Sequence, residues 1–573
     1  MAKENEKNNA NQLPDSAIQF IENVINKIRY RRKIRTDVQN ELIAHFEDEL
    51  QECKTGQERD EKAKELIKEF GEVKLLATLI RRAKKRCRPL WRTMIARIFQ
   101  IAVVLILCLF IYIAWFFSGK PAITRNYVAE LNNISIPKAD ESLNAAPLYD
   151  KAAEMLKKDV NDINEYMGIL WADLNAEQKK VVEKWFEDNK DILKLVTDGT
   201  QKPYFWRKHK EQSDMMGIII PNLVEFRMIA RIITWHMWMN AEHNRFKEAF
   251  LDIKTCFLLG QHLRGNVTLI EQLVGISIES MSARNTRELL NIYVIDKNTL
   301  AEFQQDYELM TERKDFTLQF KAESLGSYDV IQRAFTDGFG RDHIIPKVLK
   351  QLYPEAQVLL SSGTVNYPPA VVKQTSWFSD ILSDICDITS DVTQWVKKNG
   401  YLLFLHPDKE ETYRTVQQMY DYVEKMKSMT PAQLHAEGVN LEEKLMNIAK
   451  GNLLLVNNAP AIARINEICY HNKAEIEATL VVLSLVRFNR EHGNYPQNLE
   501  QLAVENYIKK LPMDPFSNKP FVYKINEQNF ILYSTGSDCK DNGGEVFRDK
   551  GGQVRTWGKS GDAVLWPVTR PEE

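Results

Sequence analysis

The chain has 573 residues, of which 44% are hydrophobic and 27% charged, so it can form two to four domains with cores and is not a disordered chain. Lys and Arg (76) nearly balance Asp and Glu (78), and the net charge of -2 does not indicate a nucleic-acid partner. The seven cysteines form no C-x-x-C pair, which excludes a zinc knuckle and a thioredoxin-like motif.

The first part of the chain predicts a helical module. Residues 1–15 are polar, and we expect a disordered tail there. Residues 16–90 should then form helices, because apolar side chains recur every four residues and give one helical stripe. The stripe consists of Ile34, Val38, Leu42, Phe46 and Leu50. A stop at Gly56 and a second amphipathic helix follow.

Two segments of this module carry a resemblance. ELIAHFEDEL and ERDEKAKELIKEFGEVKLLATLI, joined by a Gly-containing turn, resemble the HAAS-type module at the cytoplasmic N-terminus of many bacterial membrane proteins. In that family the module is regarded as a regulatory or sensing interaction module. The resemblance therefore implies a cytoplasmic protein partner and no catalysis.

Residues 97–118 predict a single transmembrane helix. The run from Ile98 to Phe117 has no charged side chain and one polar amide, and at 1.5 Å per residue it matches a hydrocarbon core of about 30 Å. It is apolar on every face, with Tyr112 and Trp115 near one end, which favours a membrane helix over a buried soluble one. Many polar residues precede it, so we expect an anchor and no cleavable signal peptide.

The distribution of basic residues predicts the orientation of this helix. Only Lys120 and Arg125 lie just beyond it, whereas eight basic residues precede it: Arg81, Arg82, Lys84, Lys85, Arg86, Arg88, Arg92 and Arg97. By the positive-inside rule the N-terminus is cytoplasmic and the bulk of the chain is extracytoplasmic. Such a cluster also suits anionic lipid or nucleic acid; topology and lipid contact suffice to explain it, and we expect no nucleic-acid partner.

After a linker at 119–146, residues 147–460 predict an irregular all-helical extracytoplasmic domain. Apolar side chains recur at three- and four-residue spacing, with short polar or Gly turns between them. Segments 224–243 and 246–263 look loosely like a tetratricopeptide hairpin, but no clean repeat follows. We expect a helical array that offers one or more grooves.

Catalytic motifs are not evident in the sequence. No G-x-S-x-G, Walker loop or paired-glycine dinucleotide motif is convincing. His236 and His243 share a helix face and His262 follows, but their Trp and Met neighbours indicate packing rather than a metal site. The acidic segment 383–391 is more typical of a solvated helix face than of a catalytic one. We therefore expect a non-enzymatic protein.

Residues 461–573 predict a small α+β domain. A helix is followed by strands at 521–525 and 530–533, with a hairpin at 526–529, and by a last strand that Trp566 packs.

This domain carries the sharpest resemblance. Its motifs are Gly493-x-Tyr495-Pro496, the LPxDPF sequence from Leu511 to Phe516, and Tyr533 to Asp538, which opens an acidic loop. Their order resembles the C-terminal half of the major pseudopilin of bacterial type II secretion systems. The anchor near residue 98 departs from that family, so we expect a pseudopilin-like module on a larger anchored protein.

The resemblance implies that the acidic loop binds Ca²⁺. Asp538 matches the first carboxylate ligand, and further oxygens are expected from Asp541, Asn542, Glu545 and Asp549. Gly543 and Gly544 permit the tight path that such a loop needs. A solvated acidic turn without metal is the alternative.

The order of these parts also resembles a class of large single-pass bacterial envelope proteins. We expect a mainly α protein of the bacterial inner membrane that acts as an extracytoplasmic binding or scaffold protein. Its partners would be membrane lipid, an envelope or secretion-related protein, and a cytoplasmic protein for the N-terminal module. The alternatives are an assembly factor of a type II secretion or pilus-like machine, and an anchored hydrolase or lyase using carboxylates of 334–391 on envelope polymer.

Overall fold

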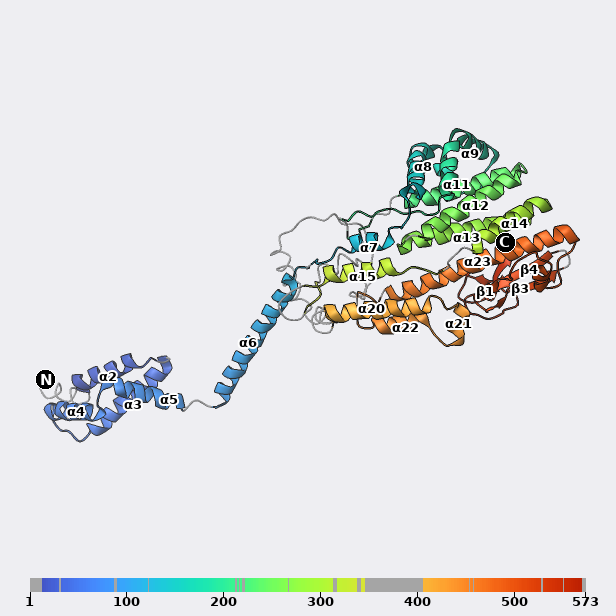
Figure 1. The fold of residues 1–573 in the computed structure, drawn as a ribbon. Coiled ribbons are helices and arrows are strands. Elements are labelled where there is room, and N and C mark those ends of the chain that lie inside the picture. The colour runs from blue at the N-terminus through green and yellow to red at the C-terminus, as the bar shows by residue number, and fades with distance from the viewer. Residues whose placement is uncertain are drawn as a thin grey trace. The chain divides into compact units, whose positions relative to one another are not determined.

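The computed structural model describes residues 13–568 except 30–31, 87–89, 122, 212–213, 216, 219–221, 266, 313–316, 337–341, 346–405, 453, 457, 527–528 and 550. The described chain is mainly α-helical, with small antiparallel sheets near its C-terminal end (Figure 1), which confirms the predicted fold class. It divides into two compact units, Met1–Trp115 and Phe116–Glu573.

The first unit contains a helical module with its own apolar core. Its helices are α2 (Asp15–Lys27), α3 (Arg32–Glu49), α4 (Gly56–Phe70) and α5 (Val73–Arg86). The predicted stripe of α3 faces this core, and four of its five members are buried: Val38, Leu42, Phe46 and Leu50. The ring of Phe46 lies 6.2 Å from that of Phe20 and 5.7 Å from that of Phe70, which joins α2, α3 and α4.

Helix α6 (Leu90–Ser118) contains the predicted membrane segment. Its stretch Met94–Phe116, 23 residues long, is long and apolar enough to cross a membrane, and its most apolar window is not buried in the structure. At 1.5 Å per residue this stretch measures about 35 Å, against about 30 Å of hydrocarbon. Large apolar side chains on it are open, as for Phe99 at 67% exposure.

The second unit begins at Phe116, in the last turn of α6. The carbonyl oxygen of Phe116 accepts a hydrogen bond from Nε2 of His343 at 2.9 Å, and the two rings stack at 4.6 Å. Gly119 follows against the side chain of Thr336, where a Cβ would lie 2.1 Å from the Thr336 methyl group. The first residues of the second unit are therefore packed closely within it.

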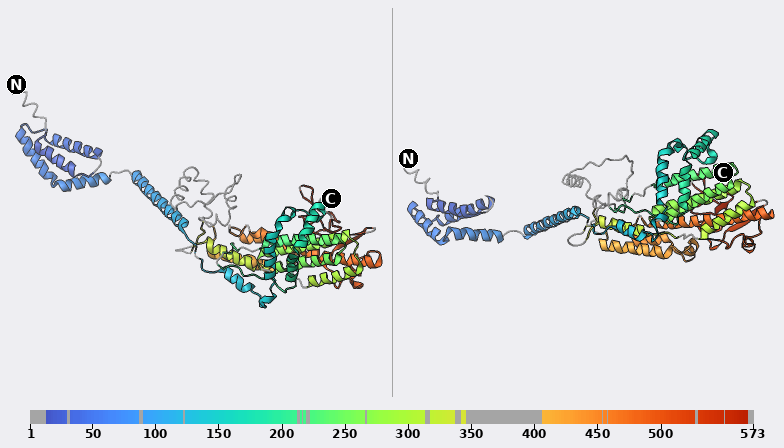
Figure 2. Two further views of the ribbon diagram at one scale, coloured as in Figure 1. Left: turned by 90° about the horizontal axis from the view of Figure 1, so that it is seen from above. Right: turned by 45° about the horizontal axis from the view of Figure 1, so that its top comes forward.

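Most of the second unit is an array of helices, seen from further directions in Figure 2. They are α7 (Tyr127–Ser135), α8 (Ala146–Asp159), α9 (Ala176–Asp188), α10 (Lys190–Thr200), α11 (Leu223–Glu242), α12 (Phe246–Arg264), α13 (Leu269–Ile292), α14 (Lys297–Glu312), α15 (Lys321–Ala334), α20 (Lys409–Met426), α21 (Pro431–Ala436) and α22 (Leu441–Ala449). Short 3₁₀ turns lie at 141–143, 160–162, 164–166 and 171–173. The expected all-helical character of this region holds for its described residues.

The long helix α23 (Asn458–His492) joins this array to the C-terminal sheets. It packs against α13, α14 and α22, and also against β1, β4 and β7. One apolar core accordingly includes side chains of α12, α14, α23 and the sheet, such as Phe257, Tyr307, Val482 and Leu532. The boundary expected at 460/461 lies near the start of α23, and the segments on its two sides share this core.

The main sheet has the order β3-β4-β7 and is antiparallel. Its strands are β3 (Val522–Asn526), β4 (Asn529–Ser534) and β7 (Ala563–Trp566). Val522 pairs with Tyr533 and Asn526 with Asn529, which confirms the predicted hairpin. One two-stranded ribbon, β1 (Met513–Asp514) with β2 (Lys519–Pro520), precedes this sheet in the sequence. A second, β5 (Phe547–Arg548) with β6 (Val554–Arg555), lies between β4 and β7.

Helices α12 and α13 approach each other closely because glycines stand on both. A Cβ on Gly275 would lie 2.5 Å from the carbonyl oxygen of Gly260 and 2.5 Å from the backbone nitrogen of Arg264. Backbone atoms cannot move aside as a flexible side chain can. The crossing therefore requires glycine at position 275.

We predict that Gly275→Ala destabilises the protein, although alanine is the better helix former by about 1 kcal/mol. The overpacked backbone contact should cost about 1–3 kcal/mol of unfolding free energy, measured by denaturant titration of the full chain in detergent. Gly326→Ala in α15 is the matched control: a Cβ added at Gly326 would meet no atom within 4 Å, so that substitution should stabilise. Equal effects of the two substitutions would contradict the proposed close crossing.

Candidate functional site

The loop that follows β4 is fixed by a buried carboxylate. Asp514 is 1% exposed, and its Oδ1 accepts hydrogen bonds from Ser534 Oγ at 2.7 Å and the Phe516 backbone N–H at 3.1 Å. Its Oδ2 accepts from the backbone N–H and the hydroxyl of Thr535. A buried carboxylate needs such donors, so Asp514 ties the LPxDPF segment to the start of the acidic loop.

Two predicted calcium ligands, Asp538 and Asn542, lie together in this loop. Oδ2 of Asp538 accepts hydrogen bonds from Asn542 Nδ2 at 3.3 Å and from the Gly561 backbone N–H at 3.2 Å. The Asn542 and Gly544 backbone N–H groups donate to Oδ2 of Asp562 at 3.0 and 2.7 Å. Asp562 was not among the predicted ligands, because it lies far along the sequence beside the last strand.

A third predicted ligand, Asp541, points to a different neighbour. Its Oδ1 accepts from the Gly543 backbone N–H at 2.9 Å and from the Tyr533 hydroxyl at 2.8 Å, and these bonds lower the pKa of the Asp541 carboxyl. Burial raises the pKa of Asp562, and the nearby charges of Asp541 and Asp538 raise it further. The loop thus holds three carboxylates whose charges repel one another.

The remaining predicted ligands, Glu545 and Asp549, have other contacts. The carbonyl oxygen of Glu545 accepts from the Asp562 backbone N–H at 2.7 Å. Asp549 lies at the end of β5 and forms an ion pair with Arg555 of β6 at 2.9 Å, which lowers the pKa of the Asp549 carboxyl. The structure shows Asp549 holding a hairpin.

Across the described residues, no group of three or more His, Cys, Asp or Glu side chains is arranged to hold a metal ion. The loop carboxylates accept hydrogen bonds from N–H and O–H groups instead. Calcium binding by Asp538 and its neighbours stays a prediction.

Beside this loop, His471 of α23 contacts a serine and a carboxylate. Its Nε2 lies 3.1 Å from Ser537 Oγ and 3.5 Å from Glu467 Oε1. Although burial acts in the opposite direction, hydrogen bonds from His471 and Ser537 lower the pKa of Glu467 to about 2. In a serine-histidine-carboxylate triad the carboxylate contacts the other ring nitrogen, so this arrangement lacks the geometry of that catalyst.

The ring of His471 is also enclosed. It stacks at 4.2 Å on Trp557 and at 5.4 Å on Phe516, and the Trp557 indole N–H donates to Glu475 at 2.8 Å. His471 therefore secures the C-terminal loops to α23. A lone histidine in the middle of a helix gives no sequence signal for this role.

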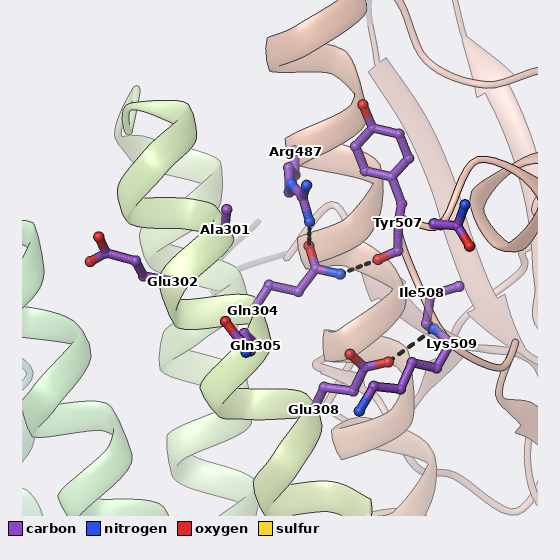
Figure 3. Close-up of a pocket in the computed structure, with 10 residues that line it drawn as sticks. Ala301, Glu302, Gln304, Gln305, Glu308, Arg487, Tyr507, Ile508 and Lys509 are labelled. Atoms are coloured by element: carbon purple, nitrogen blue, oxygen red, sulfur yellow. Dashed lines mark hydrogen bonds between the residues drawn. The ribbon is translucent and has the colours of Figure 1, made fainter.

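A pocket of about 410 Å³ lies between α14 and the segment that follows α24 (Glu500–Val504), as Figure 3 shows. Gln304 is central: its Nε2 donates to the Tyr507 carbonyl oxygen, and its Oε1 accepts from Arg487 at 3.5 Å. Glu308 accepts from the Lys509 backbone N–H at 3.0 Å. Polar groups line this pocket and form hydrogen bonds with one another. These bonds connect α14 to the segment that follows α24.

The histidines singled out in the sequence are separate from one another. His236 Nδ1 lies 2.8 Å from Asp252 Oδ2, and His243 Nδ1 lies 2.8 Å from the carbonyl oxygen of Met239. His262 contacts the Tyr149 hydroxyl at 2.7 Å through Nδ1. These contacts agree with the packing interpretation. The acidic segment 383–391 lies outside the described residues.

No protein-family model, curated protein or solved structure matches the chain. The resemblances to the HAAS module and to the major pseudopilin are therefore carried by the sequence motifs themselves and stay predictions.

The predicted calcium site has a direct check. If Ca²⁺ binds the folded loop, it should raise the melting temperature of the full chain in detergent, because a ligand of the folded state stabilises it. Asp538→Ala should abolish the rise, whereas Asp549→Asn should keep it, since Asp549 pairs with Arg555. If a well-folded chain shows no calcium-dependent rise in melting temperature, the loop is an acidic turn that binds no metal.

Proposed function

We propose that the chain is a single-pass protein of the bacterial inner membrane, with its N-terminal module in the cytoplasm and its second unit outside. Support comes from α6, where the most apolar window of Met94–Phe116 is not covered by other described residues. In water this surface would be costly, at about 25 cal/mol per Å², whereas lipid tails accept it. A helix also satisfies its backbone hydrogen bonds internally, as a bilayer requires.

The orientation is supported by charge. The helix α5 has the sequence VKLLATLIRRAKKR, with six basic and no acidic residues, and it ends only a few residues before α6. On the other side of the segment, the next basic residues are Lys120 and Arg125. Positively charged flanks remain on the cytoplasmic side of membrane helices.

Outside the membrane, we propose a binding or scaffold role without catalysis. Carboxylates of the acidic loop and of the α14 pocket have structural partners. Asp562 accepts hydrogen bonds from two backbone N–H groups, and Glu308 accepts one. His471 lacks the geometry of a serine-histidine-carboxylate triad. The partner class we favour is an envelope or secretion-related protein that contacts the outer faces of the helical array.

Protease protection tests the orientation. A full chain with an N-terminal epitope tag is expressed in a Gram-negative host, and protease is added to intact spheroplasts. We expect loss of the second unit and survival of a tagged fragment that ends just beyond α6, with the tag digested only after lysis. Replacing Arg81 and Arg82 together with the four basic residues from 84 to 88 by glutamate should reduce the protected fraction. Digestion of the tag in intact spheroplasts would contradict the proposal.

A further inference from the structure

Helix α5 carries an exposed face that the core of the first unit does not use. Ala77 is buried and packs in that core, whereas Leu75 is 59% exposed and Leu79 is 52% exposed. Residues four and seven apart lie on one side of a helix, so Leu75, Leu79 and Arg82 form a single outward stripe. Arg82 is also exposed. We call this stripe the α5 face.

The charge of α5 differs from that of the rest of the module. The helix has six basic and no acidic residues, and Arg81 and Arg82 are exposed without an ion pair to another described side chain. Lys84 pairs with Glu41 of α3. By contrast, α2, α3 and α4 each contain more acidic than basic residues. Positive charge is therefore concentrated on the one helix that also exposes two leucines.

The covalent chain limits how far α5 can be from lipid. From Arg86, where α5 ends, four residue steps lead to Leu90, and four helical steps lead from there to Met94. Fully extended and helical geometry give at most about 20 Å for this connection. Within that reach a weak surface contact becomes effectively intramolecular, and its local concentration is high.

We propose that the α5 face is a membrane-surface contact that binds anionic phospholipid, with Leu75 and Leu79 inserted at the headgroup boundary and Arg82 on the phosphates. This inference rests on the proposed function and extends it, because it assigns a lipid partner to the module itself. Exposed leucine beside arginine on an amphipathic helix is the combination that lies in a membrane interface. Basic residues next to a membrane helix are attracted by anionic lipid.

The contact would also fix how the module presents its remaining surface. With the basic α5 face against the bilayer, the acidic α3 and α4 helices would face the cytoplasm and be open to a protein partner. Like charge keeps those helices away from an anionic surface.

Site-specific crosslinking to lipid tests the inference in the full chain. The photo-crosslinking residue benzoylphenylalanine replaces Leu75, or Glu61 on the exposed surface of α4 as the matched control. Each protein is placed in nanodiscs of phosphatidylcholine, with or without phosphatidylglycerol, and lipid adducts are counted by mass spectrometry. We expect several-fold more adduct at position 75 than at 61, a rise with phosphatidylglycerol, and a loss in the Arg82→Glu background.

Three results would overturn the inference: equal adducts at the two positions, no response to phosphatidylglycerol, or crosslinks from position 75 to a second copy of the chain. Arg82 is exposed, so the module should keep its fold in the Arg82→Glu variant, which circular dichroism verifies. A chain that does not enter nanodiscs at all would contradict the proposed membrane function. A chain that enters them without lipid adducts at 75 contradicts only the role of the α5 face.

Discussion

The apolar surface of α6 is the constraint on which the account depends. A helix with an uncharged run of about 30 Å, whose large apolar side chains are exposed (67% for Phe99), has no stable place in water. It needs either a partner protein along its whole length or a bilayer. The basic residues before the helix and the polar segments on both sides of it are typical of a helix that spans a bilayer. If the helix spans a membrane, the N-terminal module and the second unit lie on opposite sides of it, and their partners must differ.

Within the second unit, α23 has the corresponding role for the fold. Its side chains are buried on several faces, because helices α13, α14 and α22 pack on it along with strands of the C-terminal sheets. Hydrogen bonds add to the apolar core: the Gln304 side chain donates to the Tyr507 carbonyl oxygen, and the His471 ring is hydrogen-bonded to the Ser537 hydroxyl. The acidic loop is thereby held on the same body as the helical array. A ligand of that loop would stabilise the array as well.

Local patterns predicted much of the fold. The four-residue spacing of Val38, Leu42 and Phe46 predicted the core face of α3, and the strand-like runs around residue 527 predicted the β3-β4 hairpin. Both depend on neighbours in sequence. The contact between Gly260 and Gly275 was not predictable, because a glycine in a helix gives no indication of which backbone will approach it.

The candidate site was predicted less completely, because sequence patterns do not show which distant residues will come into contact. Asp538, Asp541 and Asn542 were identified because they lie close together in an acidic stretch. Asp514 and Asp562 reach the loop from about twenty residues away on either side, and only the folded sheet brings them there. For Asp549, closeness in sequence suggested a calcium ligand, and the structure shows its carboxylate paired with Arg555 in a hairpin.

The most direct measurement of the central claim is membrane extraction. Membranes from cells that express the full chain are washed with alkaline carbonate and then with urea, beside a variant in which residues 94–116 are replaced by a polar linker. An integral protein remains in the pellet after both washes, and the account predicts this for the full chain and release for the variant. Release of the full chain by either wash would show that α6 does not span the bilayer.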